Sequence, residues 1–230
     1  MATLTIESYD EVLDAIDNER QQVIIDLFKE YELEPYSQLL DSPRITNHSN
    51  IELTTYLEYV LYYNLTDIID LFIDDMGVVI DDEILASTLI LQNTDTYEYL
   101  CGLGYTPEEQ TLKTAVQMRY SNIVESILSN DCDLIHNIDI DDIECLYNDS
   151  NGGDGGDDNF DEEMCETLSV LCNYNIDKHL LHPMLCKLKH MYVSNTNNIN
   201  NLDIDNLDIE KQDVIFEIIN ILENYGIDDN

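Results

Sequence analysis

Apolar residues recur along this chain at the spacing of short amphipathic helices, and the pattern is clearest over residues 112–134. Leu112 and Ala115 lie three residues apart, on one face of a first helix. The positions that follow have the i, i+1, i+4, i+5 spacing of a second amphipathic helix. They are Ile123, Val124, Ile127 and Leu128. This stretch is therefore predicted to form a helical hairpin.

The same hairpin pattern occurs twice upstream, each time with a first-helix pair followed by a second-helix stripe. The copies consist of Leu57, Val60, Ile68, Ile69, Phe72 and Ile73, and of Leu85, Thr88, Thr96, Tyr97, Leu100 and Cys101. The second-helix stripes begin at positions 68, 96 and 123, steps of 28 and 27 residues. A regular step of this size indicates a helical solenoid, because each hairpin alone would leave one apolar face in water.

These residues resemble ankyrin repeats, in the degenerate form found in large DNA viruses. In that family a Val-Val-x-x-Leu-Leu helix runs into Gly-Ala-Asp, and the chain has Ile123-Val124 and Ile127-Leu128 at those positions. Ala115 matches the small residue of the first helix, and Asp133 matches the closing Asp. At the turn where the family has glycine, the three units have Asn64, Gln92 and Arg119. The resemblance covers residues 51–135 and implies a repeat surface that binds proteins, with a host factor as partner if the chain is viral.

We therefore expect an all-α protein, an ankyrin-like helical-hairpin solenoid with an acidic Gly/Asp-rich insertion. The insertion is expected because the run Gly-Gly-Asp-Gly-Gly-Asp-Asp has no apolar period, and glycine disfavours both helix and strand. The expected parts are an N-terminal helical cap (1–50), the ankyrin-like repeats (51–145), the insertion (146–163) and a C-terminal helical region stacked on the array (164–230).

Two proline positions predict helix starts. Thr106, Pro107 and Glu109 have the order of an N-cap, a first helical residue and the N3 acid of a capping box. Pro183 is expected to open a helix that carries His182, Cys186 and nearby lysines.

The net charge of the chain restricts its possible functions more than any sequence motif does. It has 49 acidic against 9 basic residues, a formal net charge of −40. Nucleic-acid binding is excluded on this ground, because phosphate neutralisation needs a Lys/Arg patch, whereas a basic protein partner is attracted. An alternative is that the charge itself is the function, in an acidic nucleic-acid mimic or polyanionic chaperone. A third possibility is a virion-associated subunit that assembles with itself.

The N-terminus has no basic region before an apolar run, and no apolar run approaches the roughly 20 residues that a membrane helix needs. We expect an intracellular protein, in the cytoplasm or nucleus of a host cell if it is viral. Six cysteines without a CxxC pair are expected to be reduced thiols. They are Cys101, Cys132, Cys145, Cys165, Cys172 and Cys186.

Candidate chemistry is sparse. There is no GxSxG, Walker or HExxH motif, so neither catalysis nor a cofactor is expected. In the acid-free run 178–202, His182 and His190 lie eight residues apart, about 12 Å along a helix, too far for one zinc ion. A site of His182, Cys186 and His179 remains an alternative, as does a partner contact by this helix. Calcium at the single Gly-Gly-x-Gly-x-Asp copy, Gly152–Asp157, is disfavoured because calcium β-rolls need successive copies.

We interpret the chain as a non-enzymatic module that binds a basic or host protein through a helical-repeat surface. Tyrosine-rich helix faces pack well but also make good contact surfaces. The candidate contact residues are Tyr56, Tyr59 and Tyr63 on one helix, and Lys187 and Lys189 on the acid-free helix.

Overall fold

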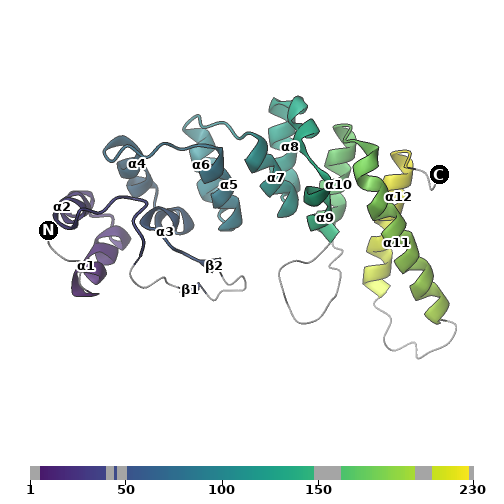
Figure 1. Ribbon diagram of the computed structural model, residues 1–230, viewed down its shortest axis with the longest axis horizontal. Coiled ribbons are helices and arrows are strands. Elements are labelled where there is room, and N and C mark those ends of the chain that lie inside the picture. Colours follow the sequence, from purple (N-terminus) through teal and green to yellow (C-terminus); the bar gives the residue numbers. More distant parts are fainter. Residues whose placement is uncertain (1–5, 40–43, 46–50, 148–161, 200–208, 228–230) are drawn as a thin grey trace. The chain divides into compact units, whose positions relative to one another are not determined.

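The structure, a computed structural model, describes residues 6–39, 44–45, 51–147, 162–199 and 209–227 (Figure 1). Their regular secondary structure is α-helical apart from a 3-10 helix, η1 (Cys132–Asn137), and one antiparallel pair of two-residue strands, β1 (Arg44–Ile45) and β2 (Ile51–Glu52). The predicted all-α class is confirmed. Most of the expected insertion lies outside these residues. All six cysteines are described and are free thiols.

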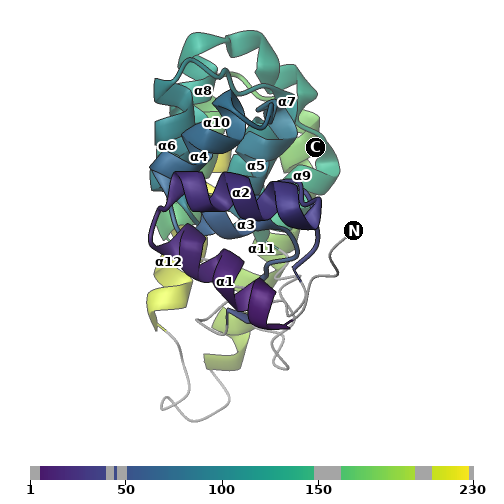
Figure 2. The same cartoon turned by 90° about the vertical axis from the view of Figure 1, so that its left-hand side faces the viewer.

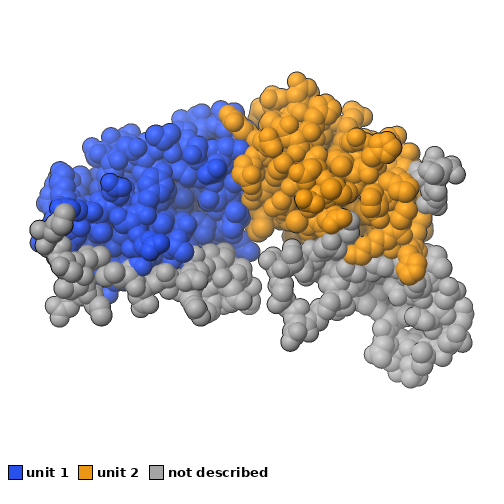
Figure 3. All heavy atoms as spheres, in the orientation of Figure 1, with its two compact units in different colours: residues 1–107 blue, residues 108–230 orange. Residues whose placement is uncertain are grey.

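The chain divides into two compact units, residues 1–107 and 108–230 (Figure 3). The division at Pro107 falls inside the predicted repeat region, 51–145. Each unit is described by itself below.

The helices of unit 1 form three pairs. They are α1 (Ile6–Asp17) with α2 (Gln21–Tyr31), α3 (Tyr56–Tyr62) with α4 (Thr66–Asp74), and α5 (Asp82–Ile90) with α6 (Thr94–Gly102). The helices of each pair pack on one another, and α2 also packs on α4 and α3 on α5 (Figures 1 and 2). Aromatic rings fill the space between the first two pairs. The Phe28 ring lies 5.3 Å from that of Tyr56 and 5.7 Å from that of Phe72, centroid to centroid.

Unit 2 contains α7 (Glu109–Gln117), α8 (Ser121–Asn130), α9 (Ile140–Tyr147), α10 (Glu162–Asn173), α11 (Lys178–Ile199) and α12 (Ile209–Asn224). Helix α9 packs on both α7 and α11, while α10 packs on both α8 and α12. The unit therefore has two layers of three helices. The predicted stripe of α8, Ile123, Val124, Ile127 and Leu128, is buried. Helices α4, α6 and α8 begin at residues 66, 94 and 121, which reproduces the predicted steps of 28 and 27.

The turn between the two helices of a pair has the same backbone in all three predicted repeats. Asn64, Gln92 and Arg119 have φ values of 52°, 57° and 61°, in the left-handed region that favours glycine. In each turn the next backbone N–H bonds to a carbonyl five residues earlier, for example Leu65 N to Val60 O at 3.1 Å. This is a Schellman helix ending. The three residues thus adopt the conformation that a turn glycine would take.

Both helix starts predicted from proline are wrong. Helix α7 begins only at Glu109, and its N-cap, Glu108, has a non-helical backbone and makes no side-chain capping bond. Helix α11 begins at Lys178, so Pro183 lies in its interior. The helix starts at Lys178 because the Asp177 carboxylate accepts the backbone N–H of His179 at 2.9 Å and so caps the helix. Pro183 cannot donate a helical hydrogen bond, and the burial of Leu181 offsets that loss.

Candidate functional site

A groove of about 640 Å³ lies in unit 1, where α2 and α4 both end. One wall is the last turn of α2 with residues 33–36, and the other is the residues that follow α4, 75–78. The lining residues are Ile25, Phe28, Lys29, Glu32, Leu33, Glu34, Pro35, Tyr36, Asp75, Met76, Gly77 and Val78. Its volume is within the range of ordinary ligand sites.

The end of α2 is fixed by a left-handed residue. Glu32 has a φ of 54°, and the backbone N–H of Leu33 donates to the Phe28 carbonyl at 2.8 Å. This Schellman ending turns the chain sharply away from the helix axis. The residues after it therefore return across the end of the helix and form a wall.

Residues 34–37 form a tight turn that is anchored to α3. The Glu34 N–H donates to the Ser37 hydroxyl, and the Ser37 N–H donates to the Glu34 carbonyl, both at 2.8 Å. The Pro35 carbonyl accepts the N–H of Leu57 at 2.8 Å. The hydrogen bonds within the turn and the bond to α3 together fix the position of this wall.

The opposite wall is the loop that follows α4. Gly77 has a φ of 73°, and the Val78 N–H donates to the Phe72 carbonyl at 2.9 Å. The Asp75 N–H donates to the Leu71 carbonyl at 3.0 Å. Gly77 is thus a position where an L side chain would be strained.

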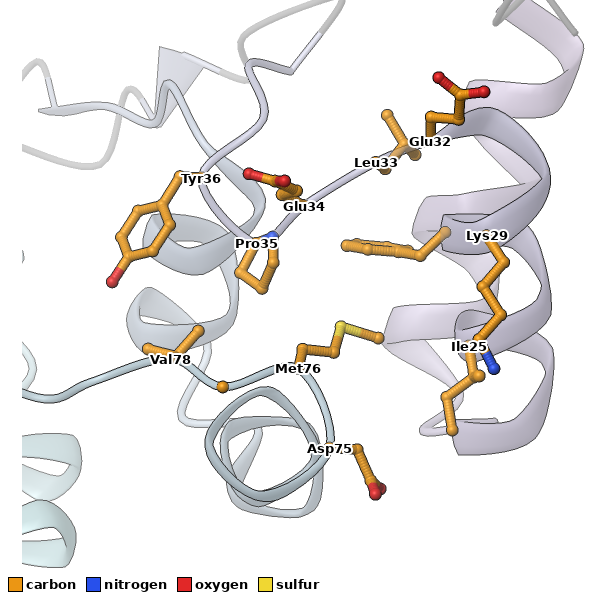
Figure 4. A pocket seen from close by; sticks show the side chains of 12 residues that line it. Ile25, Lys29, Glu32, Leu33, Glu34, Pro35, Tyr36, Asp75, Met76 and Val78 are labelled. Atoms are coloured by element: carbon orange, nitrogen blue, oxygen red, sulfur yellow. The ribbon is translucent and has the colours of Figure 1, made fainter. Parts of the chain in front are cut away.

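The interior of the groove is apolar. Phe28, Pro35 and Val78 are buried beneath it. Met76 extends from its loop toward α2, with Pro35 and Tyr36 on the facing side (Figure 4). Tyr36 keeps 52% of its surface exposed, and burial of its phenol, with Asp81 nearby, raises its pKa. An incoming apolar side chain would contact a preformed surface here.

The margin of the groove is negatively charged. Glu32, Glu34 and Asp75 are exposed around it, against one cation, Lys29 (Figure 4). Within the described segments, none of these four side-chain charges takes part in an ion pair or hydrogen bond. Glu32 and Asp75 are the C-caps of α2 and α4, where the helix dipole already places partial negative charge. The site is suited to a positively charged ligand with an apolar part.

The predicted tyrosine contacts are mostly core residues. Tyr56 is 0% exposed and Tyr59 is 7% exposed, because the face of α3 that carries them packs inside unit 1. Burial raises the pKa of Tyr56 to about 12, and the Tyr59 hydroxyl donates to the Asp17 carboxylate at 2.8 Å. Tyr63 is 47% exposed, with its ring 4.7 Å from that of Tyr59. Of the three, only Tyr63 presents a large surface.

The predicted lysine contacts are engaged within unit 2. Lys189 of α11 forms an ion pair with Glu223 of α12, with 2.8 Å between Nζ and Oε1. Lys187 is half-buried and likewise has an interaction partner. Lys189 therefore links α11 to α12, and the charge of both lysines is less available to a partner than the sequence indicated.

The candidate metal residues come together only in part. The Cys186 sulfur lies 3.8 Å from Nδ1 of His182. In the part of the chain that the structure covers, no third His, Cys, Asp or Glu joins them, or any other pair, in a group that could hold a metal ion. The Gly152–Asp157 motif lies outside that part.

Reasoning from the sequence missed the groove altogether, because its walls are about forty residues apart. The one local signal was Pro35-Tyr36-Ser37 directly after an amphipathic helix, which is typical of a turn. The sequence also carried an unnoticed capping box, Thr55-x-x-Glu58, which starts α3.

Comparisons of the chain with protein-family models, with curated proteins and with solved structures found no match in any of the three. Among the described residues, no helix is long and apolar enough to cross a membrane.

Proposed function

We propose that this protein is a non-enzymatic binding module that recognises a basic protein partner through the surface of its helical pairs. The observation that carries the proposal is the groove of unit 1, an apolar surface bordered by carboxylates that have no ion-pair partner among the described residues. An overall charge of −40 would attract a basic partner from a distance, and the groove would provide the close contact.

We also propose that the helical pairs are ankyrin-like repeats of viral type, with a host factor as the partner. The left-handed turns at Asn64, Gln92 and Arg119 support this, because the family has glycine at the corresponding turn. The 27- and 28-residue steps of the second helices support a repeated unit.

The test is a pull-down from eukaryotic cell lysate, washed at about 0.15 M and then about 0.5 M salt. The screening length falls from about 8 Å to roughly 4 Å between these washes. We expect one or a few proteins to survive the second wash, since apolar contacts in a groove are not screened. Histones and ribosomal proteins that are all lost at high salt would contradict this proposal and favour a nucleic-acid mimic.

A further inference from the structure

We infer that the groove of unit 1 receives a short basic segment of the partner protein. One aliphatic or aromatic side chain of that segment would lie against Met76 and Tyr36. Its Lys or Arg side chains would meet the carboxylates of Glu32, Glu34 and Asp75. This inference rests on the proposed function and adds the place and the chemistry of recognition.

The charge distribution indicates a cationic ligand. Three carboxylates surround the groove against the single ammonium of Lys29. Glu32 and Asp75 also stand at helix C-termini, where an acid is locally unfavourable. A cation bound between the two helix ends would be attracted by both the carboxylates and the dipoles.

The apolar interior of the groove indicates that a ligand with charged groups alone would not fill the site. Exposed ion pairs contribute little affinity because water and salt screen them. Binding energy at protein interfaces comes mainly from apolar and aromatic anchors that fill pockets. The partner segment therefore needs an apolar side chain between its basic residues.

The walls of the groove are already in place. The backbone bonds of Leu33 to Phe28, Leu57 to Pro35 and Val78 to Phe72 fix both sides. A ligand would therefore not have to order a loop before it binds, which lowers the entropic cost of association. A short segment is enough to occupy such a site.

A second copy of this chain is the less suitable occupant, because the cations of its acid-free helix are engaged. Lys189 is paired with Glu223, and Lys187 is not free. The Lys178 ammonium lies 4.9 Å from the ring centre of Tyr225. The Lys and Arg side chains of a separate basic protein are not engaged in these contacts.

The experiment is selection from a random heptapeptide display library on the full chain at about 0.15 M salt. Selected peptides are then titrated by fluorescence anisotropy. The groove variant is Glu32→Gln/Glu34→Gln/Asp75→Asn. The control, Glu11→Gln/Asp95→Asn/Glu98→Gln, changes the net charge equally at exposed positions of unit 1 outside the groove. A third variant, Met76→Ser, keeps the charges and removes part of the apolar wall.

We expect selected peptides to contain an apolar residue flanked by Lys or Arg. The groove variant should weaken their binding about 10-fold, since three exposed ion pairs together approach the energy of one decade. Met76→Ser should weaken it severalfold, and the control variant by less than about 2-fold. The inference is overturned if no peptide is enriched, if the enriched peptides lack this pattern, or if they bind the groove variant like the wild type.

Two further measurements identify which molecule occupies the groove. They also distinguish failure of this inference from failure of the proposed function. Self-association in sedimentation velocity that the groove variant abolishes would make a second copy the occupant, and would overturn the inference. In the lysate pull-down, a salt-resistant partner retained equally by wild type and groove variant would overturn the inference and leave the proposed function standing. Absence of any salt-resistant partner of the wild type would overturn the proposed function instead.

Discussion

Two acidic regions of this protein use their carboxylates in opposite ways. In unit 2, the Lys113 ammonium lies 3.1 Å from Glu109, 3.2 Å from Asp139 and 3.9 Å from Asp142. In unit 1, the groove carboxylates of Glu32 and Asp75 have no such partner among the described residues. The first cluster is matched from within, and the second is left for a ligand.

The hydrogen bonds around Lys113 show what a structural acidic cluster requires. Asp139 and Asp142 cap the start of α9 reciprocally: the Asp139 N–H donates to Asp142 at 3.0 Å, and the Asp142 N–H donates to Asp139 at 3.2 Å. The amide of Gln117 also donates to Asp142 at 2.8 Å. Because each carboxylate has a donor, this cluster is explained by folding alone. The groove carboxylates are not, which is why they carry the functional proposal.

Disrupting the buried stripe of α8 should have the largest effect on the stability of the protein. Replacing Ile123, Val124 and Ile127 by Asp places three charges in the core of unit 2. Helical circular dichroism and cooperative melting should be lost. Asn122→Asp/Ser126→Asp, on the exposed face of the same helix α8, is the control and should fold. An unchanged melting curve for the triple variant would contradict the packing of α8.

Replacing Lys113 in the cluster of unit 2 should lower the stability of the protein much more than replacing Lys29 at the groove. Lys113→Ala leaves the buried carboxylate of Asp142 beside Asp139 without its cation, so the free energy of unfolding should fall by about 1–3 kcal/mol. Lys29→Ala should change it by less than about 0.5 kcal/mol. Urea denaturation of both variants measures the difference. Equal effects would mean that the groove is as internally matched as the cluster.

Removing carboxylates should change the free energy of unfolding in opposite directions in the two regions. Asp139→Ala removes the N-cap of α9 and should cost about 1 kcal/mol. Glu32→Gln/Glu34→Gln/Asp75→Asn removes acids from two helix C-termini and should leave stability unchanged or raise it by about 0.3–1 kcal/mol per helix end. Urea midpoints distinguish the two results. A groove variant that is less stable than the wild type would give its carboxylates a structural role.

The smallest effect is a pH dependence of the matched cluster. The backbone N–H of Asp142, followed by Lys113, holds the pKa of Asp139 below its ordinary value. A lowered pKa in the folded state stabilises above the unfolded pKa of about 3.9, and this contribution is lost as the pH falls through the folded value. Asp139→Asn keeps a capping oxygen but does not titrate.

The stability of wild type relative to Asp139→Asn should therefore decrease between about pH 5 and pH 2. Burial raises the pKa of Asp142, which works in the other direction, and both proteins contain that group. The difference between their unfolding curves isolates Asp139. A difference that is constant with pH would contradict the capping role.

The sequence predicted the parts that depend on local periodicity. The stripe from Ile123 to Leu128 is buried as expected, because a 3.6-residue period can be read along one helix. The same reasoning could not separate core from contact tyrosines. Tyr56 and Tyr63 share one helical stretch, and only the packing of α3 in unit 1 buries the first and exposes the second.

The groove was beyond sequence reasoning for a physical reason. Its two walls are about forty residues apart in the sequence, and one of them is held to α3 by a backbone bond between distant residues, Leu57 to Pro35. Such bonds leave no side-chain pattern. The false capping box at Thr106 shows the complementary error. Its residue types fit, yet the backbone of Glu108 is not helical and the helix starts later.

The most direct test of the account is site-specific photo-crosslinking in lysate. A photoreactive phenylalanine analogue replaces Tyr36 in the groove or Tyr63 at the C-cap of α3, two tyrosines of unit 1 with similar exposures of 52% and 47%. We expect a salt-resistant basic protein to be crosslinked from position 36, and to be lost in the Glu32→Gln/Glu34→Gln/Asp75→Asn background. Crosslinking of that protein from position 63 alone, or equally in both backgrounds, would contradict the groove as the binding site.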